Sequence, residues 1–482
     1  MAAASLALFA FTTLRRVGYP FALEWMESGS YDSLVRLLDN ERLYDRPSLE
    51  FVPYNYTPLY YIASAAMARL SGVGFASMRL VSLLAACGTM LLIFHLVRRA
   101  GAGRFPAIAG AITFGATYAL TGSYMDTARP DSLFVLLLTG GLAFLMAGER
   151  SRASSVLAGL LFAAAYFTKQ STLPCLGLLL VYLLVRRSRV GLGVLAGLLA
   201  TTSLGVSLAM HGSNGWYGYY TLEVATGYAL RLSNLPHFFA KYLAPLTVSV
   251  LFAGAWLGWP ARERTRSDQT LFIALASIVL GCFWLTLYPG TAPNVALPAA
   301  MACSVALGLG LDAVLTRARS LDPPHGARLT TLVYAAIVLQ WVGLLYDPTK
   351  LVPDSRDVAA GWSLVRKIAA TPGDVLIPNH GYLGRLAGKP GQAHALALAN
   401  AVQGDRRGAA RAVAESLDTS VARGRYSLLI LDDASAGARD PIPGYGPPQP
   451  CFSDRDVFWT RAGSRTRPEF FRYRLDRGDR GR

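Results

Sequence analysis

Long apolar runs alternate with short polar segments through the first 347 residues of the chain. Eleven such runs lie at 1–14, 76–97, 105–124, 132–148, 155–168, 171–186, 190–210, 238–259, 270–288, 294–313 and 329–347. Many approach the roughly 20 apolar residues that a helix needs to cross the hydrocarbon core of a bilayer. The pattern therefore predicts a polytopic α-helical membrane protein with about eleven spans. Only 16% of residues are charged, against about a quarter in soluble domains, which supports this class.

Basic residues between the runs predict the orientation of the spans. One set of connections contains Arg98, Arg99, Arg104, Arg150, Arg152, Arg186, Arg187, Arg189, Arg262, Arg264, Arg266, Arg317, Arg319 and Arg328. The alternate connections are 24–61, 126–131, 169–170, 211–235 and 288–294, and they are poor in basic residues or, in the first case, rich in acids. The positive-inside rule places these alternate connections, and everything after residue 348, outside the cytoplasm.

Two features complicate this alternation. Arg15 and Arg16 follow the first run on the predicted outer side and count against it locally. If the segment 57–72 crossed the membrane fully, every later loop would change sides, so we expect it to be a juxtamembrane helix leading into the 76–97 run. The loop arginines also account for the net charge of +16, so topology explains that charge and no nucleic-acid partner is indicated.

The composition changes at about residue 348, where charge, Pro and Gly increase and apolar runs of membrane length end. Helical stretches at 358–370 and 408–417 alternate with short β-rich runs at 373–378 and 426–433. This alternation predicts that 348–482 forms a small α/β extracytoplasmic domain, with a loose basic tail from Arg467 onward.

Cysteine and histidine do not indicate a metal site. Four of the five cysteines lie inside apolar runs, where cysteine behaves as a small hydrophobe, and the six histidines are scattered. No pair has the spacing of zinc or haem ligands, and no disulfide framework is visible.

The first loop, 15–61, carries the most suggestive chemistry. Between residues 24 and 61 it concentrates the carboxylates Glu24, Glu27, Asp32, Asp39, Glu41, Asp45 and Glu50. Glu24 and Glu27 are three positions apart, so on a helix they share one face, where one of them can act as a general base. The alternative is that they cap the following helix or pair with Arg36 or Arg42.

Two cations on the same predicted side are candidates for holding a phosphate. Arg129 lies between two apolar runs, beside Asp126 and Asp131, and an arginine there needs an anion such as a lipid phosphate. Lys169 lies between two closely spaced runs and suits a phosphate contact, although a snorkelling lysine is the alternative. Asp131, next to Pro130, also suits the positive end of the following helix.

Aromatic residues at the exit of the first loop are candidates for lining a substrate site. Tyr54, Tyr56 and Tyr60 lie close to the next apolar run. Aromatic rings beside polar groups suit sugar faces and isoprenoid chains, but an interfacial aromatic belt gives the same pattern.

The arrangement of these blocks resembles a known superfamily. A short first run and a large outer loop are followed by SMRLVSLLAACGTMLL, TARPDSLFVLLL, YFTKQSTLP and PGTAPNVALPA. Over residues 1–347 this order resembles the GT-C superfamily of polyprenyl-phosphate-sugar-dependent glycosyltransferases, in particular protein O-mannosyltransferases and lipid A aminoarabinose transferases.

The resemblance implies an acidic catalytic residue near the start of the first outer loop. Where many relatives carry an Asp-Glu pair, this chain has Met26-Glu27, so Glu27 or Glu24 would act as the base. It also implies that Arg129 and Lys169 hold the donor phosphate, and a divalent cation, Mg or Mn, could bind Asp126 or Asp131.

The predicted reaction is transfer of a sugar, with inversion, from a polyprenyl-phosphate donor to a glycan, lipid or protein acceptor. It would take place on the outer face of the bacterial inner membrane. Two other classes of function remain open. A lipid or glycan flippase would show broken helices near mid-span and internal symmetry, and the sequence shows no repeat. A non-catalytic envelope assembly protein would use the first loop and the C-terminal region to bind partners.

Overall fold

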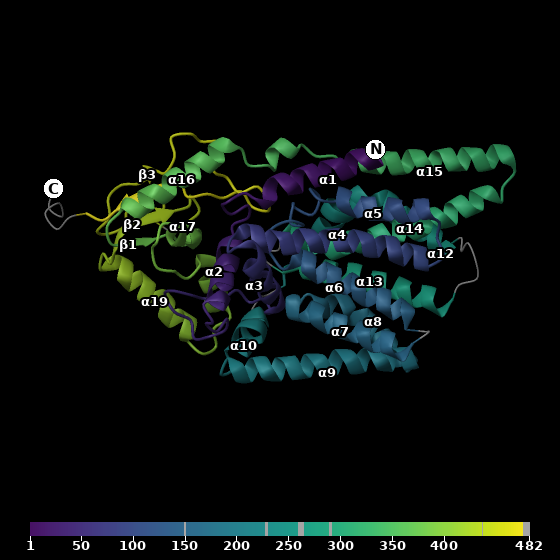
Figure 1. The fold of residues 1–482 in the computed structure, drawn as a ribbon, viewed down its shortest axis with the longest axis horizontal. Coiled ribbons are helices and arrows are strands. Elements are labelled where there is room, and N and C mark those ends of the chain that lie inside the picture. The colour runs from purple at the N-terminus through teal and green to yellow at the C-terminus, as the bar shows by residue number, and fades with distance from the viewer. Residues whose placement is uncertain (149–150, 227–229, 259–264, 289–291, 436, 476–482) are drawn as a thin grey trace.

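The computed structural model describes residues 1–148, 151–226, 230–258, 265–288, 292–435 and 437–475. Long helices form a bundle, and a small domain of helices and strands packs against one end of it (Figure 1). The first loop lies between these two parts, with α2 facing the small domain. The carboxylate-rich first loop is therefore enclosed where the helical bundle and the small domain meet.

The helices of the bundle follow the apolar runs. They are α1 (Ala2–Val17), α4 (Phe75–Arg99), α5 (Arg104–Ala116), α6 (Asp131–Ala147), α7 (Arg152–Thr168), α8 (Thr172–Arg186), α9 (Arg189–Gly212), α12 (Thr247–Gly258), α13 (Arg266–Thr286), α14 (Leu297–Arg319) and α15 (Pro323–Gly343). Shorter helical segments of α, 3₁₀ and π type extend or connect them: α10 (Trp216–Gly218), η1 (Tyr219–Glu223), η2 (Val224–Thr226), η3 (Leu232–Asn234), α11 (Leu235–Phe238), η4 (Phe239–Leu243), η5 (Ala244–Leu246), η6 (Pro293–Ala296) and η7 (Pro348–Lys350).

Within the described residues, six helical segments are long and apolar enough to cross a membrane. They are Phe75–Arg99, Arg189–Gly212, Leu232–Gly258, Arg266–Thr286, Pro293–Arg319 and Pro323–Lys350. The helices α6, α7 and α8 are apolar but shorter. The chain is a polytopic helical membrane protein, while the count of eleven crossings stays a prediction.

One predicted run does not form a single helix. The apolar run 105–124 is helical only to Ala116, and the chain then turns, with Gly122 at a φ of +74°. Apolar composition alone did not reveal this turn. The chain leaves the helix here and brings residues 123–131 back toward the first loop.

Close approach of backbones holds the bundle together around α14. A Cβ added at Gly310 would lie 1.8 Å from the carbonyl oxygen of Phe252 in α12. Only glycine permits this contact, which is typical of helix packing in membranes, where small residues bring backbones together. α14 is thus the central helix, and 89% of its most apolar stretch is buried.

The first loop contains two helices, α2 (Glu27–Leu38) and α3 (Leu59–Ser71). With 13 residues, α3 is about 20 Å long, shorter than the roughly 30 Å hydrocarbon core. This length fits a helix that does not cross the membrane, as the charge alternation requires of 57–72, and its juxtamembrane position stays a prediction.

The C-terminal domain has the predicted α/β character. Its elements are α16 (Ser355–Ala370), β1 (Asp374–Leu376), α17 (Gly381–Leu386), α18 (Ala395–Gln403), α19 (Ala409–Ala422), β2 (Tyr426–Leu431), β3 (Gln449–Pro450) and β4 (Phe470–Tyr473). The strand order is β1-β2-β4-β3, with β1 parallel to β2 and the other pairs antiparallel.

The prediction of a loose tail from Arg467 is wrong for the described part. Arg467 is buried, where it pairs with Glu469 and donates to the Val457 carbonyl, and residues 470–473 form β4. The basic composition concealed a strand whose Phe471 is buried in the domain core. Residues 476–482 lie outside the described residues.

Some residues used for the orientation also lie outside the described residues. They are Arg150, Arg262, Arg264, residues 227–229 of the 211–235 connection and residues 289–291 of the 288–294 connection.

Candidate active site

Eight charged side chains are buried together where the end of α1, the first loop, the 123–131 turn and the start of α8 meet. They are Arg16, Glu24, Glu27, Arg79, Asp126, Arg129, Asp131 and Lys169, and none is more than 7% exposed. Four are cations and four are carboxylates. Because an unpaired buried charge is very costly, each must have an opposite charge within reach.

Glu27 is fully occupied by structural contacts. Arg79 of α4 donates to both of its oxygens, at 3.1 Å and 2.6 Å. The backbone N–H groups of Leu23 and Ala128 donate to the same carboxylate, at 2.6 Å and 2.5 Å. Arg79 in turn donates to carbonyls of the first loop, including that of Tyr19 at 2.6 Å. The Glu27–Arg79 pair therefore ties α4, the first loop and the 123–131 turn together.

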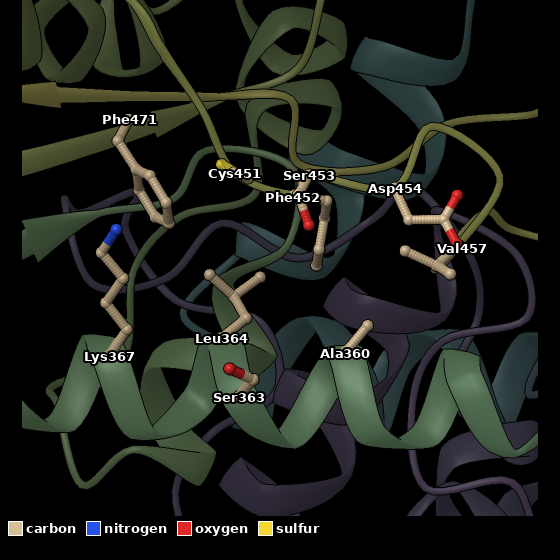
Figure 2. Close-up of a pocket in the computed structure, with 10 residues that line it drawn as sticks. All are labelled: Ala360, Ser363, Leu364, Lys367, Cys451, Phe452, Ser453, Asp454, Val457 and Phe471. Carbon is tan, nitrogen blue, oxygen red and sulfur yellow. The ribbon is translucent and has the colours of Figure 1, made fainter.

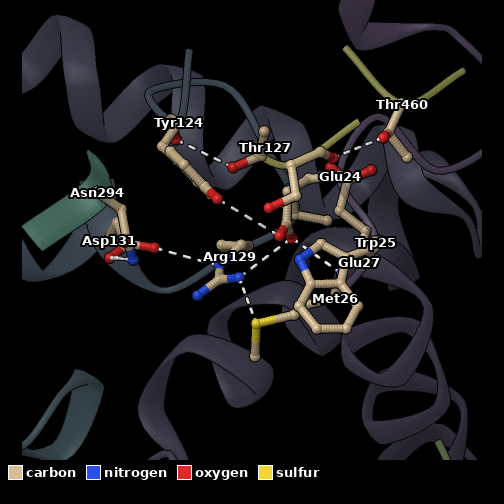
Figure 3. Close-up of polar contacts among 12 residues, drawn as sticks. Glu24, Trp25, Met26, Glu27, Tyr124, Thr127, Arg129, Asp131, Asn294 and Thr460 are labelled. Atoms are coloured by element: carbon tan, nitrogen blue, oxygen red, sulfur yellow. Dashed lines mark hydrogen bonds and ion pairs between the residues drawn. The ribbon is translucent and has the colours of Figure 1, made fainter. Parts of the chain in front are cut away.

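Glu24 is held less completely. Its Oε2 accepts from Arg129 Nη1 at 3.1 Å and from the Met26 N–H at 3.0 Å, whereas its Oε1 has, among the residues that the structure describes, only the Tyr124 hydroxyl at 3.5 Å (Figure 3). Burial raises the pKa of Glu24 to about 7, against the opposing effect of Arg129. A carboxylate that titrates near neutrality and has an oxygen to spare has the properties of a general base. The alternative pairing of these glutamates with Arg36 or Arg42 is wrong, since Arg36 pairs with Glu41.

The two cations predicted to bind phosphate share one carboxylate. Lys169 Nζ lies 2.5 Å from Asp131 Oδ1, and Arg129 Nε lies 3.4 Å from Asp131 Oδ2. Asn294 Nδ2 donates to the same Oδ1 at 2.9 Å. Asp131 lies in the first turn of α6, so its charge also suits that helix terminus. Lys169 is thus a buried, paired residue, and the snorkelling interpretation is wrong.

Asp126 lies on a different branch of the cluster. It pairs with Arg16 at 3.1 Å and accepts from the Tyr118 hydroxyl at 2.8 Å. Within the described residues, there is no group of three or more His, Cys, Asp or Glu side chains that could hold a metal ion. The site therefore does not fit the divalent cation that Asp126 or Asp131 was expected to bind.

The three candidate tyrosines have different positions. The Tyr56 hydroxyl accepts from Arg129 at 2.7 Å, and its ring lies 5.8 Å from Lys169 Nζ, so Tyr56 belongs to the cluster. Tyr54 packs against Tyr56, with 6.2 Å between ring centroids. Tyr60 is fully buried between α3 and α4, where its hydroxyl lies 3.0 Å from the Met78 carbonyl.

Comparison with known proteins gives this cluster a family context. Residues 55–231 match the family described as dolichyl-phosphate-mannose-protein mannosyltransferase. The fold is similar to that of ArnT from Cupriavidus metallidurans bound to undecaprenyl phosphate, with a TM-score of 0.60, 15% identity, and coverage of 96% of each chain. The fold is that of the GT-C glycosyltransferases. Among curated proteins, no sequence matches it.

A second solved structure shows the same GT-C fold. The archaeal oligosaccharyltransferase AglB from Archaeoglobus fulgidus, in complex with an inhibitory peptide and a dolichol-phosphate, has a TM-score of 0.51 and 11% identity. The match covers 89% of this chain and 69% of AglB. The predicted GT-C fold is thus confirmed.

Several residues of the GT-C site were not singled out from sequence. Arg79 offered a signal, because it is an arginine at the start of an apolar run, and charge within a span is costly. Asn294 lies in the block PGTAPNVALPA but has no feature of its own. Tyr124 and the C-terminal residues near the site gave no signal, because only the fold brings them there.

A separate pocket of about 240 Å³ lies in the C-terminal domain (Figure 2). It is lined by Ala360, Ser363, Leu364, Lys367, Cys451, Phe452, Ser453, Asp454, Val457 and Phe471. None of the eight clustered charges lines this pocket, so it is distinct from the candidate active site.

Proposed function

We propose that the protein transfers a sugar from a polyprenyl-phosphate donor to an acceptor hydroxyl on the extracytoplasmic face of the bacterial inner membrane, with Glu24 as the general base. The observation that carries this proposal is the buried Glu24 carboxylate, which lies beside the cation Arg129 and whose Oε1 has a single polar contact, at 3.5 Å, in the described part of the chain. Support comes from the solved structures of similar fold, which contain undecaprenyl phosphate and dolichol-phosphate.

Of the two glutamates, Glu24 suits the role of the base better than Glu27. Glu27 accepts four hydrogen bonds in a fixed arrangement, and taking up a proton would break its pair with Arg79. We assign Glu27 to holding the first loop and the 123–131 turn in place. Glu24 keeps hydrogen-bonding capacity at Oε1, where its partner among the described residues is the Tyr124 hydroxyl at 3.5 Å.

Arg129 and Lys169 are proposed to hold the donor phosphate. A lysine ammonium has three N–H donors, and within the described residues one of those of Lys169 is used, on Asp131. Arg129 Nε has a charge contact with Asp131 but no hydrogen bond there. Both cations therefore keep donor capacity for an anion, and Asp131 and Tyr56 keep them at the same place.

The reaction follows from this arrangement. The acceptor hydroxyl oxygen attacks the anomeric carbon while Glu24 removes its proton. The bond between that carbon and the phosphate oxygen breaks, and its electron pair leaves with the lipid phosphate. Arg129 and Lys169 stabilise the charge that develops on the phosphate. A single displacement inverts the anomeric centre.

The test is a transfer assay in membranes with radiolabelled polyprenyl-phosphate mannose and polyprenyl-phosphate aminoarabinose. We expect Glu24→Gln to lower transfer by a factor of about 10² to 10⁴, the contribution typical of a general base. The matched control is Glu41→Gln, an exposed carboxylate of the same loop, which should keep wild-type transfer. Equal transfer by wild type and Glu24→Gln, with both inserted and folded, would overturn the proposed base. Turnover of a soluble nucleotide sugar without polyprenyl donor would overturn the proposed donor.

A further inference from the structure

A loop of the C-terminal domain, residues 460–466, reaches into the candidate active site. The N–H groups of Arg461 and Ala462 both donate to the carbonyl of Leu23, at 2.7 Å and 3.0 Å. Leu23 immediately precedes Glu24. The N–H of Gly463 donates to the carbonyl of Gly122 at 3.2 Å. One short loop therefore contacts the backbone beside the proposed base and the backbone of the 117–122 turn.

The loop has a defined shape of its own. Thr460 Oγ1 donates to the Ser464 carbonyl at 2.9 Å and accepts from the Thr466 N–H at 2.8 Å. Its entry is tied to α16, because the Phe458 N–H and the Arg461 side chain both donate to Asp357, at 2.6 Å and 2.8 Å. The loop is thus fixed to the C-terminal domain, and Figure 3 draws its Thr460 in the same view as Glu24.

Gly463 lies directly against Tyr124 of the site. Its φ of +61° lies in the left-handed region that favours glycine. A Cβ added there would lie 2.1 Å from the hydroxyl oxygen of Tyr124 and 2.9 Å from the adjoining ring carbon. Tyr124 is buried, and its hydroxyl is the single hydrogen-bond partner of Glu24 Oε1 within the described residues.

We propose that Gly463 is a positioning residue of the active site, through which the C-terminal domain seats the Tyr124 hydroxyl against Glu24. The proposal rests on the proposed function for the role of Glu24. Because Gly463 has no side chain, it leaves space for the Tyr124 hydroxyl. Its hydrogen bond to Gly122, two residues before Tyr124, sets the distance between the 460–466 loop and Tyr124. The C-terminal domain is then part of the catalytic centre rather than an appended module.

The experiment compares Gly463→Ala with Gly444→Ala in the full chain. Both glycines have positive φ, at +61° and +82°, so both variants bear backbone strain, but a Cβ at Gly444 meets no atom within 4 Å. With radiolabelled polyprenyl-phosphate mannose or aminoarabinose, whichever the wild type uses, we expect kcat of Gly463→Ala to fall at least tenfold. Gly444→Ala should keep wild-type kcat. The KM for the donor should change little, because Arg129 and Lys169 are untouched.

Two further readouts separate positioning from a general loss of stability. Gly463→Ala should slow the Tyr124→Phe enzyme less than it slows the wild type, because the nearest atom that the new methyl group meets, the hydroxyl oxygen, is gone and the ring carbon at 2.9 Å is left. Both single variants should move the acidic limb of the pH–rate profile upward, because the carboxylate loses a hydrogen-bond donor that favours its charged form. If Gly463→Ala does not fold, the pH–rate profile of Tyr124→Phe provides the test.

Equal kcat for Gly463→Ala and Gly444→Ala, or additive losses in the double variant, would overturn this inference. An unchanged pH profile in Tyr124→Phe would do the same. If Glu24→Gln keeps wild-type transfer, the proposed base and this inference both fail. If Glu24→Gln is inactive while Gly463→Ala matches Gly444→Ala, the inference alone fails.

Discussion

At the scale of single residues, two glutamates three positions apart have different surroundings. Glu27 meets Arg79, which is 52 positions away, and Glu24 meets Arg129, which is 105 positions away. The sequence predicted that one of the pair acts as a base, but it could not separate them, because both partners come from other elements. The number of hydrogen bonds that each carboxylate accepts separates them.

The pH dependence of transfer should report Glu24. Its pKa is raised to about 7, so the base is half deprotonated near neutrality, and initial rates should rise with pH through about 7 and then level off. Initial rates measured in buffered membranes between pH 5 and 9 check this. A rate that is flat from pH 5 to 8 would contradict it.

The stability of the protein should change with pH in the opposite direction to the transfer rate, because of the same Glu24 carboxyl group. The folded pKa of Glu24 lies above its ordinary value of 4.5, so the folded state binds the proton more tightly than the unfolded state does. The stabilisation is fully present below about pH 4.5 and is lost as pH rises through about 7. The melting temperature of Glu24→Gln should therefore depend less on pH over this interval than that of wild type, as measured by thermal unfolding in detergent.

The Glu27–Arg79 pair should matter more for stability than an exposed pair. Removing one partner of a buried ion pair leaves an uncompensated charge and costs about 3–5 kcal/mol, whereas an exposed pair contributes about 0–1 kcal/mol. Arg79→Ala should therefore lower the melting temperature far more than Arg36→Ala, whose partner Glu41 is exposed. Similar melting temperatures for the two variants would contradict a structural role for this pair.

At the scale of elements, apolar runs predicted where helices form but not how they pack. Each run corresponds to a helical segment, because about twenty apolar residues suit a helix in lipid. The run 105–124 shows the limit, since its last third is a turn that only tertiary contacts explain. α14 is as apolar as its neighbours, and no feature of its composition marked it as the central helix.

The close contact between α12 and α14 gives an element-scale prediction. Gly310→Ala would place its methyl group 1.8 Å from the Phe252 carbonyl, so the helices must separate, and overpacking of this kind typically costs about 1–3 kcal/mol. The control is Gly254→Ala in α12, where a Cβ meets no atom within 4 Å and alanine favours the helix by about 1 kcal/mol. Thermal unfolding in detergent should show a loss for the first variant and no loss for the second.

At the scale of the whole molecule, the sequence predicted an α/β domain after residue 348 but not its place over the first loop. Short β runs alternating with helices are visible in one dimension, whereas the contact surface is not. Tyr219 donates to Asp405 at 3.0 Å, and Arg385 lies 2.5 Å from Asp32, so the domain is bound both to η1 and to α2 of the first loop. The basic residues near the end of the chain were interpreted as solvated, although Arg467 and Arg472 are buried parts of this domain.

The Asp32–Arg385 pair offers a test of this docking that is independent of catalysis. Asp32 is buried in α2, and burial raises its pKa to about 6, with Arg385 opposing the rise. Without Arg385 the carboxylate would have to ionise in the same buried place with no partner, so its folded pKa would rise further. Wild type and Arg385→Ala should therefore have similar melting temperatures near pH 4, where Asp32 is protonated in both folded proteins. The difference should grow as pH rises through 6 toward 8.

Arg439→Ala, which breaks an exposed pair with Asp433 in the same domain, should show no such divergence. A difference for Arg385→Ala that stays constant from pH 4 to 8 would mean that the charge of Asp32 does not depend on docking of the C-terminal domain.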